Sequence, residues 1–259
     1  MLKEQVKTAG FTKYSEVPMA DLVSCYCPTF GRIHCLEEAV ESFLRQDYKG
    51  PKELVILNDR DDQNIIFDHP EVKIFNMPYR ITPIGAKFNT LVSLCEGNVL
   101  FCWDDDDIYL PHRISYSLER MKDGVYHTTD AFFEKGAKNI EASSNMFHST
   151  HAISTKLFND IGGYREYDKC SVDVDLKSDI TRKLKREYST PTPVSERFYI
   201  YRWSTVGTYH LSGWGGSHAD VSKSTEAVVE GEKARGKVPT GDIVLKPKWS
   251  YEYTEYLPK

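Results

Sequence analysis

The chain lacks the marks of a membrane-spanning or secreted protein. Its longest apolar runs, such as residues 54–57, have the length of a strand and are too short to cross a bilayer. Residues 1–10 carry charges and no apolar block, so we expect no signal peptide. The six cysteines are scattered, and none belongs to a paired-cysteine zinc knuckle. We therefore expect a cytoplasmic protein with reduced thiols in its core.

The sequence also lacks a basic excess and internal repeats. Its net charge is −5 and its pI is near 5.9, which argues against a dedicated nucleic-acid coat protein. A local basic patch remains compatible with this total charge. Hydrophobic residues make up 40% of the chain and charged residues 27%, as in an ordinary globular protein with a substantial core.

The first half alternates strand and helix patterns. Apolar runs predict strands at 22–27, 53–57, 72–75 and 99–103, the first of them stopped by Pro28. Helical spacing of apolar residues predicts helices at 32–46 and 84–95. Short connections between these elements indicate parallel strand–helix–strand units. The polar residues follow the carboxyl ends of the strands, the edge at which open parallel sheets bind ligands.

The second half has a weaker pattern. We expect strands at 149–153 and 197–203 and helices at 155–161 and 175–185. Residues 219–259 are polar without a clear apolar stripe, which predicts a tail that packs on the domain or extends from it. The expected organisation is an arm over 1–20, one α/β domain over 21–218 and this tail.

Four aspartates, Asp104, Asp105, Asp106 and Asp107, follow the apolar strand that ends at Trp103. Successive carboxylates repel each other unless a cation neutralises them. Oxygen ligands select Mg²⁺ or Mn²⁺ over softer metals. The simpler interpretation is a solvated turn before a helix near Pro111, where acids also suit the helix N-terminus. The apolar strand in front favours the metal site.

Five segments, taken in order, resemble family 2 glycosyltransferases. These are Pro-Thr-Phe-Gly-Arg at 28–32, Leu-Asn-Asp at 57–59, Gly-x-x-x-Asn at 85–89, the Asp-x-Asp (DXD) run at 104–107 with its later proline, and Gly-Gly-Tyr at 162–164. Each match is weak alone, but five in family-like order over about residues 22–215 are specific. The resemblance implies a GT-A fold, which is Rossmann-like, with a mixed, mostly parallel central sheet flanked by helices.

The resemblance also implies the donor-binding residues. Asp59 would bind the nucleotide base, with uracil favoured, beside the loop of Pro28, Thr29, Phe30 and Arg32. Asp104 would contact the ribose or the metal, Asp106 would be the principal ligand of Mn²⁺ or Mg²⁺, and Asp105 would belong to the donor-binding set. Lys87 or Arg80 would neutralise phosphate charge, although the simpler interpretation makes each a solvated surface residue. Asp107 alternatively starts the next helix.

The catalytic base is expected after the Gly-Gly-Tyr turn. The family has Glu-Asp-x-Asp-Leu there, whereas this chain has Val172, Asp173, Val174, Asp175 and Leu176. The first acid is missing, and Asp173 is the candidate base of an inverting transfer. Asp175 would cap the helix, and capping is also the simpler role for Asp173.

Residues 199–210 resemble a segment that, in this family, comes late in the sequence and returns to the active site. This resemblance makes His210 a candidate third metal ligand, with His218 as its competitor, and 213–216 a flexible loop that could close over the donor.

The predicted function is metal-dependent, inverting transfer of a sugar from a nucleotide diphosphate, with UDP favoured, to an acceptor hydroxyl. Two alternatives stay open: nucleotidyl transfer onto a sugar phosphate, and a non-catalytic nucleotide-sugar-binding relative, which the missing acid at Val172 would suit. The sequence leaves the acceptor undecided between a glycan, a protein and a modified nucleic-acid base.

Overall fold

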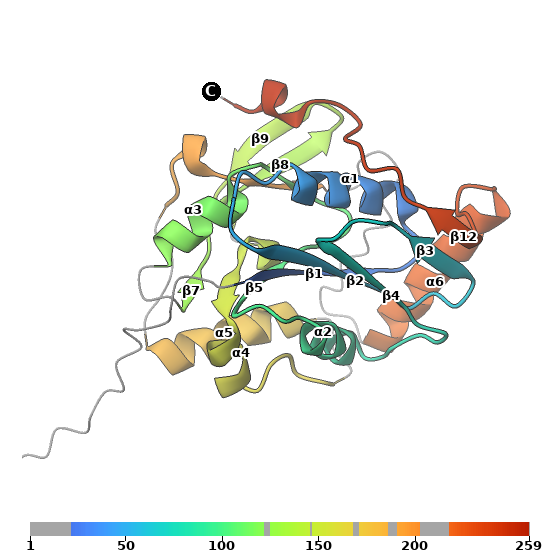
Figure 1. Cartoon of the computed structure of the whole chain (residues 1–259), viewed down its shortest axis with the longest axis horizontal. Helices are drawn as coiled ribbons and strands as arrows, with labels where there is room; N and C mark the ends of the chain where they lie inside the picture. Colours follow the sequence, from blue (N-terminus) through green and yellow to red (C-terminus); the bar gives the residue numbers. More distant parts are fainter. Residues whose placement is uncertain are drawn as a thin grey trace, which may run out of the picture.

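The computed structural model describes residues 22–121, 125–145, 147–167, 171–185, 191–202 and 218–258. Its centre is a six-stranded sheet in the order β4-β2-β1-β5-β10-β7 (Figure 1). Four neighbouring strands are parallel: β4 (Val72–Asn76), β2 (Lys52–Asn58), β1 (Val23–Thr29) and β5 (Val99–Cys102). Antiparallel pairs join β10 (Ala152–Ser154) to β5 and to β7 (Tyr126–His127). The predicted mixed, mostly parallel sheet is confirmed.

Helices cover both faces of this sheet (Figure 1). Helix α1 (Ile33–Leu44) lies on one face, and α2 (Ile84–Ser93), α4 (Thr155–Asp160) and α5 (Val172–Leu184) lie on the other. Side chains alternate between two apolar clusters: Cys25 and Cys27 of β1 belong to the α1 cluster, whereas Tyr26 belongs to the opposite one. Because both faces are buried, the strands read as continuous apolar runs.

The first strand extends past the proline that was expected to stop it. Pro28 and Thr29 pair only with Leu57 and Asn58 of β2, because the pairing of β1 with β5 ends at Tyr26. The missing N–H of proline is tolerated where only one side of the strand needs it. The cysteine prediction is confirmed for the described residues, in which Cys25, Cys27, Cys35, Cys95 and Cys102 are all free thiols.

A second sheet of order β6-β11-β8-β9 stands beside the central one. It consists of β6 (Ile108–Tyr109), β11 (Tyr199–Arg202), β8 (Ala131–Gly136) and β9 (Asn139–Ser143). Helix α3 (Arg113–Arg120), and the short helices η1 (His148–Thr150) and η2 (Val194–Glu196), complete this half. Of the four strands the sequence pattern predicted only β11. Two-residue pairings such as β6 leave no periodic signal.

The C-terminal residues form regular elements that the sequence pattern did not predict. Helix α6 (His218–Ala234) is followed by β12 (Gly241–Val244), which pairs in parallel with β3 (Gln63–Ile66), and then by η3 (Tyr253–Tyr256). Trp249 and Tyr253 are buried with the α1 cluster. In the described part of the chain, no helix is both long and apolar enough to span a membrane.

Candidate active site

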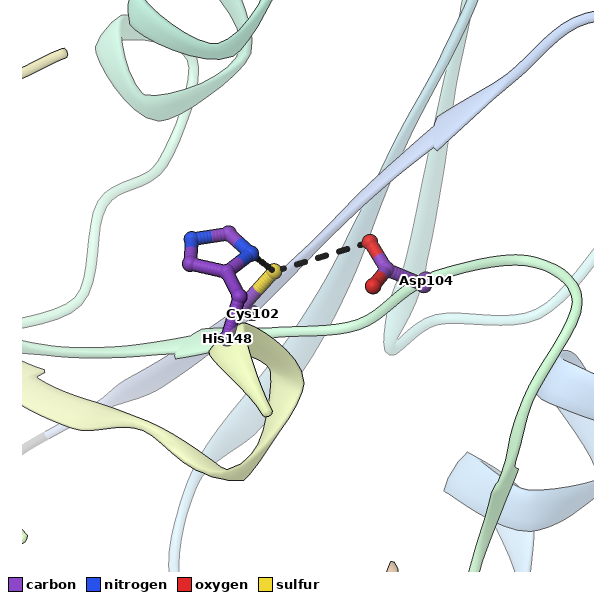
Figure 2. Close-up of side chains that lie close together, drawn as sticks. All are labelled: Cys102, Asp104 and His148. Atoms are coloured by element: carbon purple, nitrogen blue, oxygen red, sulfur yellow. Dashed lines mark hydrogen bonds between the residues drawn. The ribbon is translucent and has the colours of Figure 1, made fainter. Parts of the chain in front are cut away.

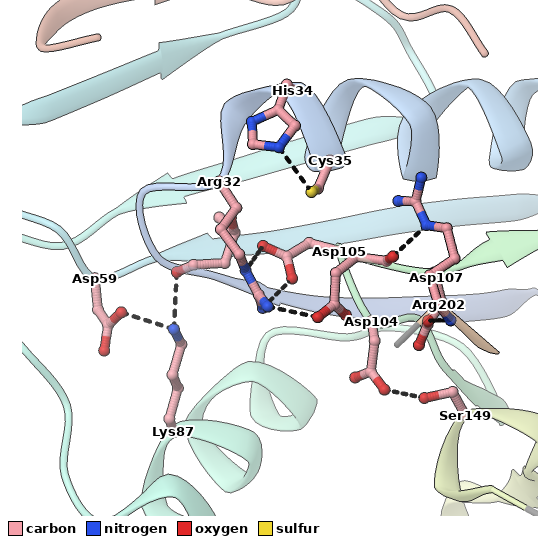
Figure 3. A network of polar contacts seen from close by, with 12 residues as sticks. Arg32, His34, Cys35, Asp59, Lys87, Asp104, Asp105, Asp107, Ser149 and Arg202 are labelled. Carbon is pink, nitrogen blue, oxygen red and sulfur yellow. Dashed lines mark hydrogen bonds and ion pairs between the residues drawn. The ribbon is translucent and has the colours of Figure 1, made fainter. Parts of the chain in front are cut away.

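Polar side chains gather where the parallel strands β1, β2 and β5 end. Thr29 ends β1 opposite Asn58 of β2, and the acidic run begins two residues after the last residue of β5. Figure 3 shows that a single network of polar contacts includes Arg32, Asp59, Lys87, Asp104, Asp105 and Asp107. The residues predicted for the site thus lie together at these strand ends, the edge at which open parallel sheets bind ligands.

Arg32 binds two members of the acidic run (Figure 3). Its Nη1 lies 2.6 Å from Asp106 Oδ2, and its Nε donates to Asp105 over 3.2 Å. Burial raises the pKa of Asp105 to about 6, since Arg32 offsets only part of the desolvation cost and the neighbouring Asp106 charge adds to it. One guanidinium therefore serves two buried carboxylates.

Asp107 points away from Arg32 into the body of the protein. Its carboxylate accepts hydrogen bonds from the Tyr199 hydroxyl at 2.5 Å and from the Arg202 backbone N–H at 2.8 Å. Burial, together with the Asp106 charge, raises the pKa of Asp107 well above its ordinary value. The expectation that Asp107 starts the next helix is wrong, because β6 intervenes and α3 begins only at Arg113.

Asp104 differs from the other three. It is half-buried, and its carboxylate accepts a hydrogen bond from the Ser149 hydroxyl. Its backbone N–H donates to the Tyr109 hydroxyl at 2.6 Å, which fixes the start of the acidic run. Within the described residues no Lys or Arg forms an ion pair with Asp104, whereas Arg32 pairs with both Asp105 and Asp106. The charge of Asp104 is therefore less neutralised than the charges of Asp105 and Asp106.

Asp59 is buried and surrounded by donors. Its Oδ1 lies 2.7 Å from both Lys87 Nζ and Arg80 Nη1, and its Oδ2 accepts from the Ile81 N–H at 3.0 Å. Burial alone would raise the pKa of Asp59, but Lys87 and Arg80 outweigh it and hold the pKa below its ordinary value. The surface interpretation of Lys87 is wrong, since this side chain is buried and also donates to the Thr29 carbonyl.

The loop after β1 presents Phe30. Pro28 and Thr29 are buried inside β1, whereas Phe30 is half-buried with the Arg80 guanidinium 3.7 Å from its ring centre. Helix α6 covers the next residue: a Cβ on Gly31, whose φ is +76°, would lie 2.7 Å from Val229 Cγ1. The sequence pattern gave no sign that α6 packs against this loop.

Asp173 lies in the first turn of α5, half-buried. Val172, which replaces the family's first acid, is buried in the cluster on the α2 face, so its side chain points into the core. Burial raises the pKa of Tyr201, and the charges of Asp107, Asp106, Asp104 and Asp173 raise it further, which places Asp173 within electrostatic range of the same tyrosine as the acidic run.

The capping prediction for this helix is wrong. Ser171 occupies the N-cap position of α5, and Asp175 instead lies 3.6 Å from Arg165. His210 and the glycine-rich loop at 213–216 lie outside the described residues, as does the side chain of His218.

Sequence reasoning missed the residues that hold the acidic run in place. Arg202 donates through Nε to the Asp106 carbonyl at 2.5 Å and pairs with the buried Glu38. Glu38 in turn accepts from the Ser250 N–H at 2.7 Å and from the Tyr253 hydroxyl at 2.9 Å. An acid on the buried face of α1 was the available signal, because such a residue requires a partner.

The mixed, mostly parallel sheet flanked by helices is the GT-A fold. Comparison with known protein families matches residues 24–175 to glycosyl transferase family 2. The chain therefore belongs to glycosyl transferase family 2, and it is a glycosyltransferase. Nucleotidyl transfer and a purely binding role are set aside.

Individual relatives agree with this assignment. The chain is 27% identical over 204 residues to WcaA of Escherichia coli (strain K12), named as a candidate colanic acid biosynthesis glycosyl transferase, over 69% of this chain and 71% of the relative.

Two solved structures share the fold. One is the mannosyltransferase PcManGT from Pyrobaculum calidifontis in complex with GDP-Man and Mn²⁺, with a TM-score of 0.54, 14% identity, and coverage of 84% of this chain and 76% of that one. The other is S. aureus TarS, with a TM-score of 0.51, 14% identity, and coverage of 90% of this chain but 41% of that one.

Proposed function

We propose that this glycosyltransferase transfers a sugar from a UDP-sugar to an acceptor hydroxyl with inversion, assisted by a divalent cation. The observation that carries the proposal is the gathering of Asp59, Phe30 and the acidic run at the ends of β2, β1 and β5. A base, a diphosphate and a sugar can be bound in a row along such an edge. The mannosyltransferase and TarS structures with GDP-Man and UDP-GlcNAc support a nucleotide-sugar donor.

The environment of Asp59 supports uracil as the base. An ionised carboxylate has about four acceptor positions. Arg80, Lys87 and the Ile81 N–H occupy three of them, two on Oδ1 and one on Oδ2. One position is left for a base N–H. Uracil offers a single N–H donor on its pairing edge, whereas guanine offers two adjacent ones.

The acidic run suits a hard cation, because its donors are carboxylate oxygens. Asp104 and Asp106 would hold Mn²⁺ or Mg²⁺, and the ion would supply electrostatic stabilisation of the departing diphosphate. Arg32 already contacts Asp106, so the ion must share that carboxylate with Arg32 or displace it. Asp105 and Asp107 are buried and hydrogen-bonded to protein partners, so their role would be to hold the conformation of the loop.

Asp173 would act as the base. Its place in the first turn of α5 leaves it half-buried, whereas Val172 faces the core. A carboxylate there takes the proton of the acceptor hydroxyl as its oxygen attacks the anomeric carbon from the face opposite the diphosphate. The anomeric configuration is thereby inverted.

A donor screen tests the proposal. We expect release of UDP, in preference to GDP or TDP, from the matching sugar nucleotide in the presence of Mn²⁺, and little release after chelation. In the presence of an acceptor, NMR of the product is expected to show the inverted anomer. Preferential GDP release would overturn the base assignment, and release unaffected by chelation would overturn the metal assignment.

A further inference from the structure

A cysteine, a carboxylate and a histidine meet beside the acidic run. Cys102 is the last residue of β5, Asp104 lies two residues on, and His148 begins η1 (Figure 2). Cys102 Sγ is 3.2 Å from His148 Nδ1 and 3.7 Å from Asp104 Oδ1. All three ligand atoms lie within 4.8 Å of one another. No other group of three such residues meets this distance in the part of the chain that the structure describes.

The spacing suits a tetrahedral ion. Usual Zn–S and Zn–N bond lengths give a separation of roughly 3.5 Å between two ligand atoms of a tetrahedral site. The sulfur-to-nitrogen and sulfur-to-oxygen distances lie on either side of that value. Small side-chain adjustments would therefore bring all three atoms into the coordination sphere of one ion.

Two of the three ligands have outer partners that orient them. His148 Nε2 is hydrogen-bonded to the Tyr164 hydroxyl at 2.5 Å, and that hydroxyl lies 2.7 Å from the hydroxyl of Tyr26. The second oxygen of Asp104 accepts from the Ser149 hydroxyl. Metal-ligating histidines and carboxylates usually have such partners, which fix the ring orientation and aim the free nitrogen at the ion. Hydrogen bonds thus already orient His148 and Asp104 for binding a metal ion.

The donor set selects the metal. One sulfur, one nitrogen and one oxygen suit Zn²⁺, whereas Mg²⁺ and Mn²⁺ prefer oxygen donors. Cys102 is buried, but Asp104 and His148 are half-exposed, so an ion can enter from their side. Three protein ligands leave the fourth position of a tetrahedral zinc site to water or a substrate oxygen.

We infer that Cys102, Asp104 and His148 form a Zn²⁺ site next to the hard-cation site proposed for the donor. Asp104 belongs to both. Zinc bound here draws Asp104 away from the donor ion, a consequence that rests on the proposed function, whereas zinc binding itself does not.

Cobalt spectroscopy tests the site without any sugar nucleotide. The metal-free full-length protein is titrated with Co²⁺, whose thiolate complexes show a near-ultraviolet charge-transfer band. We expect one equivalent of Co²⁺ to produce this band and Zn²⁺ to abolish it. Cys102→Ser should eliminate the band, His148→Ala should weaken Co²⁺ binding at least tenfold, and Tyr164→Phe should weaken it by about tenfold.

Cys35→Ser is the matched control. Cys35 Sγ lies 3.3 Å from His34 Nε2, so it is a second buried thiol beside an imidazole, but it has no third ligand within the described residues. Cys35→Ser should keep the band. The absence of a charge-transfer band in the folded wild type would overturn the site. A band that survives both Cys102→Ser and His148→Ala would overturn it as well, and neither result would bear on donor turnover.

Discussion

Negative charge is neutralised differently at the two ends of the candidate site, the proposed base end around Asp59 and the proposed sugar end at the acidic run. At the base end, one carboxylate, Asp59, is shared by Lys87 and Arg80. At the proposed sugar end, Arg32 pairs with Asp105 and Asp106, whereas no Lys or Arg of the described residues pairs with Asp104. The base end is thus neutralised by the protein itself. The sugar end has an excess of negative charge, which a bound cation can neutralise.

The largest effect on stability is expected from Asp59→Asn, which leaves Lys87 and Arg80 without their shared acid. Removing one partner of a buried ion pair typically costs about 3–5 kcal/mol, measurable by urea unfolding at pH 7. Glu71→Gln is the control, because its pair with Lys52 is partly exposed and should contribute at most about 1 kcal/mol. Equal losses for the two variants would refute the contrast.

The same variant gives a pH test. The pKa of Asp59 lies below its ordinary value in the folded protein, so its contribution to the free energy of unfolding is present above about pH 4 and is lost as the pH falls further. The stability difference between wild type and Asp59→Asn should therefore shrink below about pH 4. A stability difference that stays constant from pH 7 to pH 3 would show that Lys87 and Arg80 do not lower the pKa of Asp59 in the folded protein.

A smaller loss of stability is expected from Glu38→Gln. The substitution removes the carboxylate that pairs with Arg202, the residue that donates to the Asp106 carbonyl. Only one cation loses its acid here, and Arg202 keeps its hydrogen bond to the Asp106 carbonyl, so the loss should lie at the lower end of the buried-pair range, about 3 kcal/mol of unfolding free energy. On the same helix, Glu41→Gln removes an exposed pair with Arg45 that contributes about 0.3–0.5 kcal/mol. If Glu38→Gln loses no more stability than Glu41→Gln, Glu38 does not stabilise the acidic run through Arg202.

The smallest effect concerns the base end. Phe30→Ala should raise the donor KM by about 2- to 12-fold, since an aromatic contact contributes roughly 0.5–1.5 kcal/mol, with kcat nearly unchanged. Phe30→Tyr, which keeps the ring, should restore the KM. Steady-state kinetics of donor turnover checks both, and a loss confined to kcat would place Phe30 elsewhere in the reaction.

How far the sequence predicted the structure differs between the halves. The parallel strands β1, β2, β4 and β5 could be predicted because both of their faces are buried and they read as apolar runs. Short antiparallel strands and α6 could not, because neither has a strong periodic pattern. That the candidate site residues gather at one edge of the sheet could be predicted from the strand ends.

The partners at that site did not follow from the sequence. Arg32, Arg202 and Ser149 are brought to the acidic run by α1, β11 and η1, which are distant in sequence. Only the assembled fold shows which carboxylate each of them serves.

Donor turnover with Mn²⁺ in Asp106→Asn, compared with Asp105→Asn, tests the central claim most directly. Both acids bind Arg32, so both variants disturb the same guanidinium. If Asp106 holds the cation, Asp106→Asn should lose about 100-fold or more of kcat, the usual scale for one lost electrostatic contact to the transition state. Asp105→Asn should lose less than tenfold. Full activity in Asp106→Asn, or equal losses in both variants, would contradict the metal site proposed here.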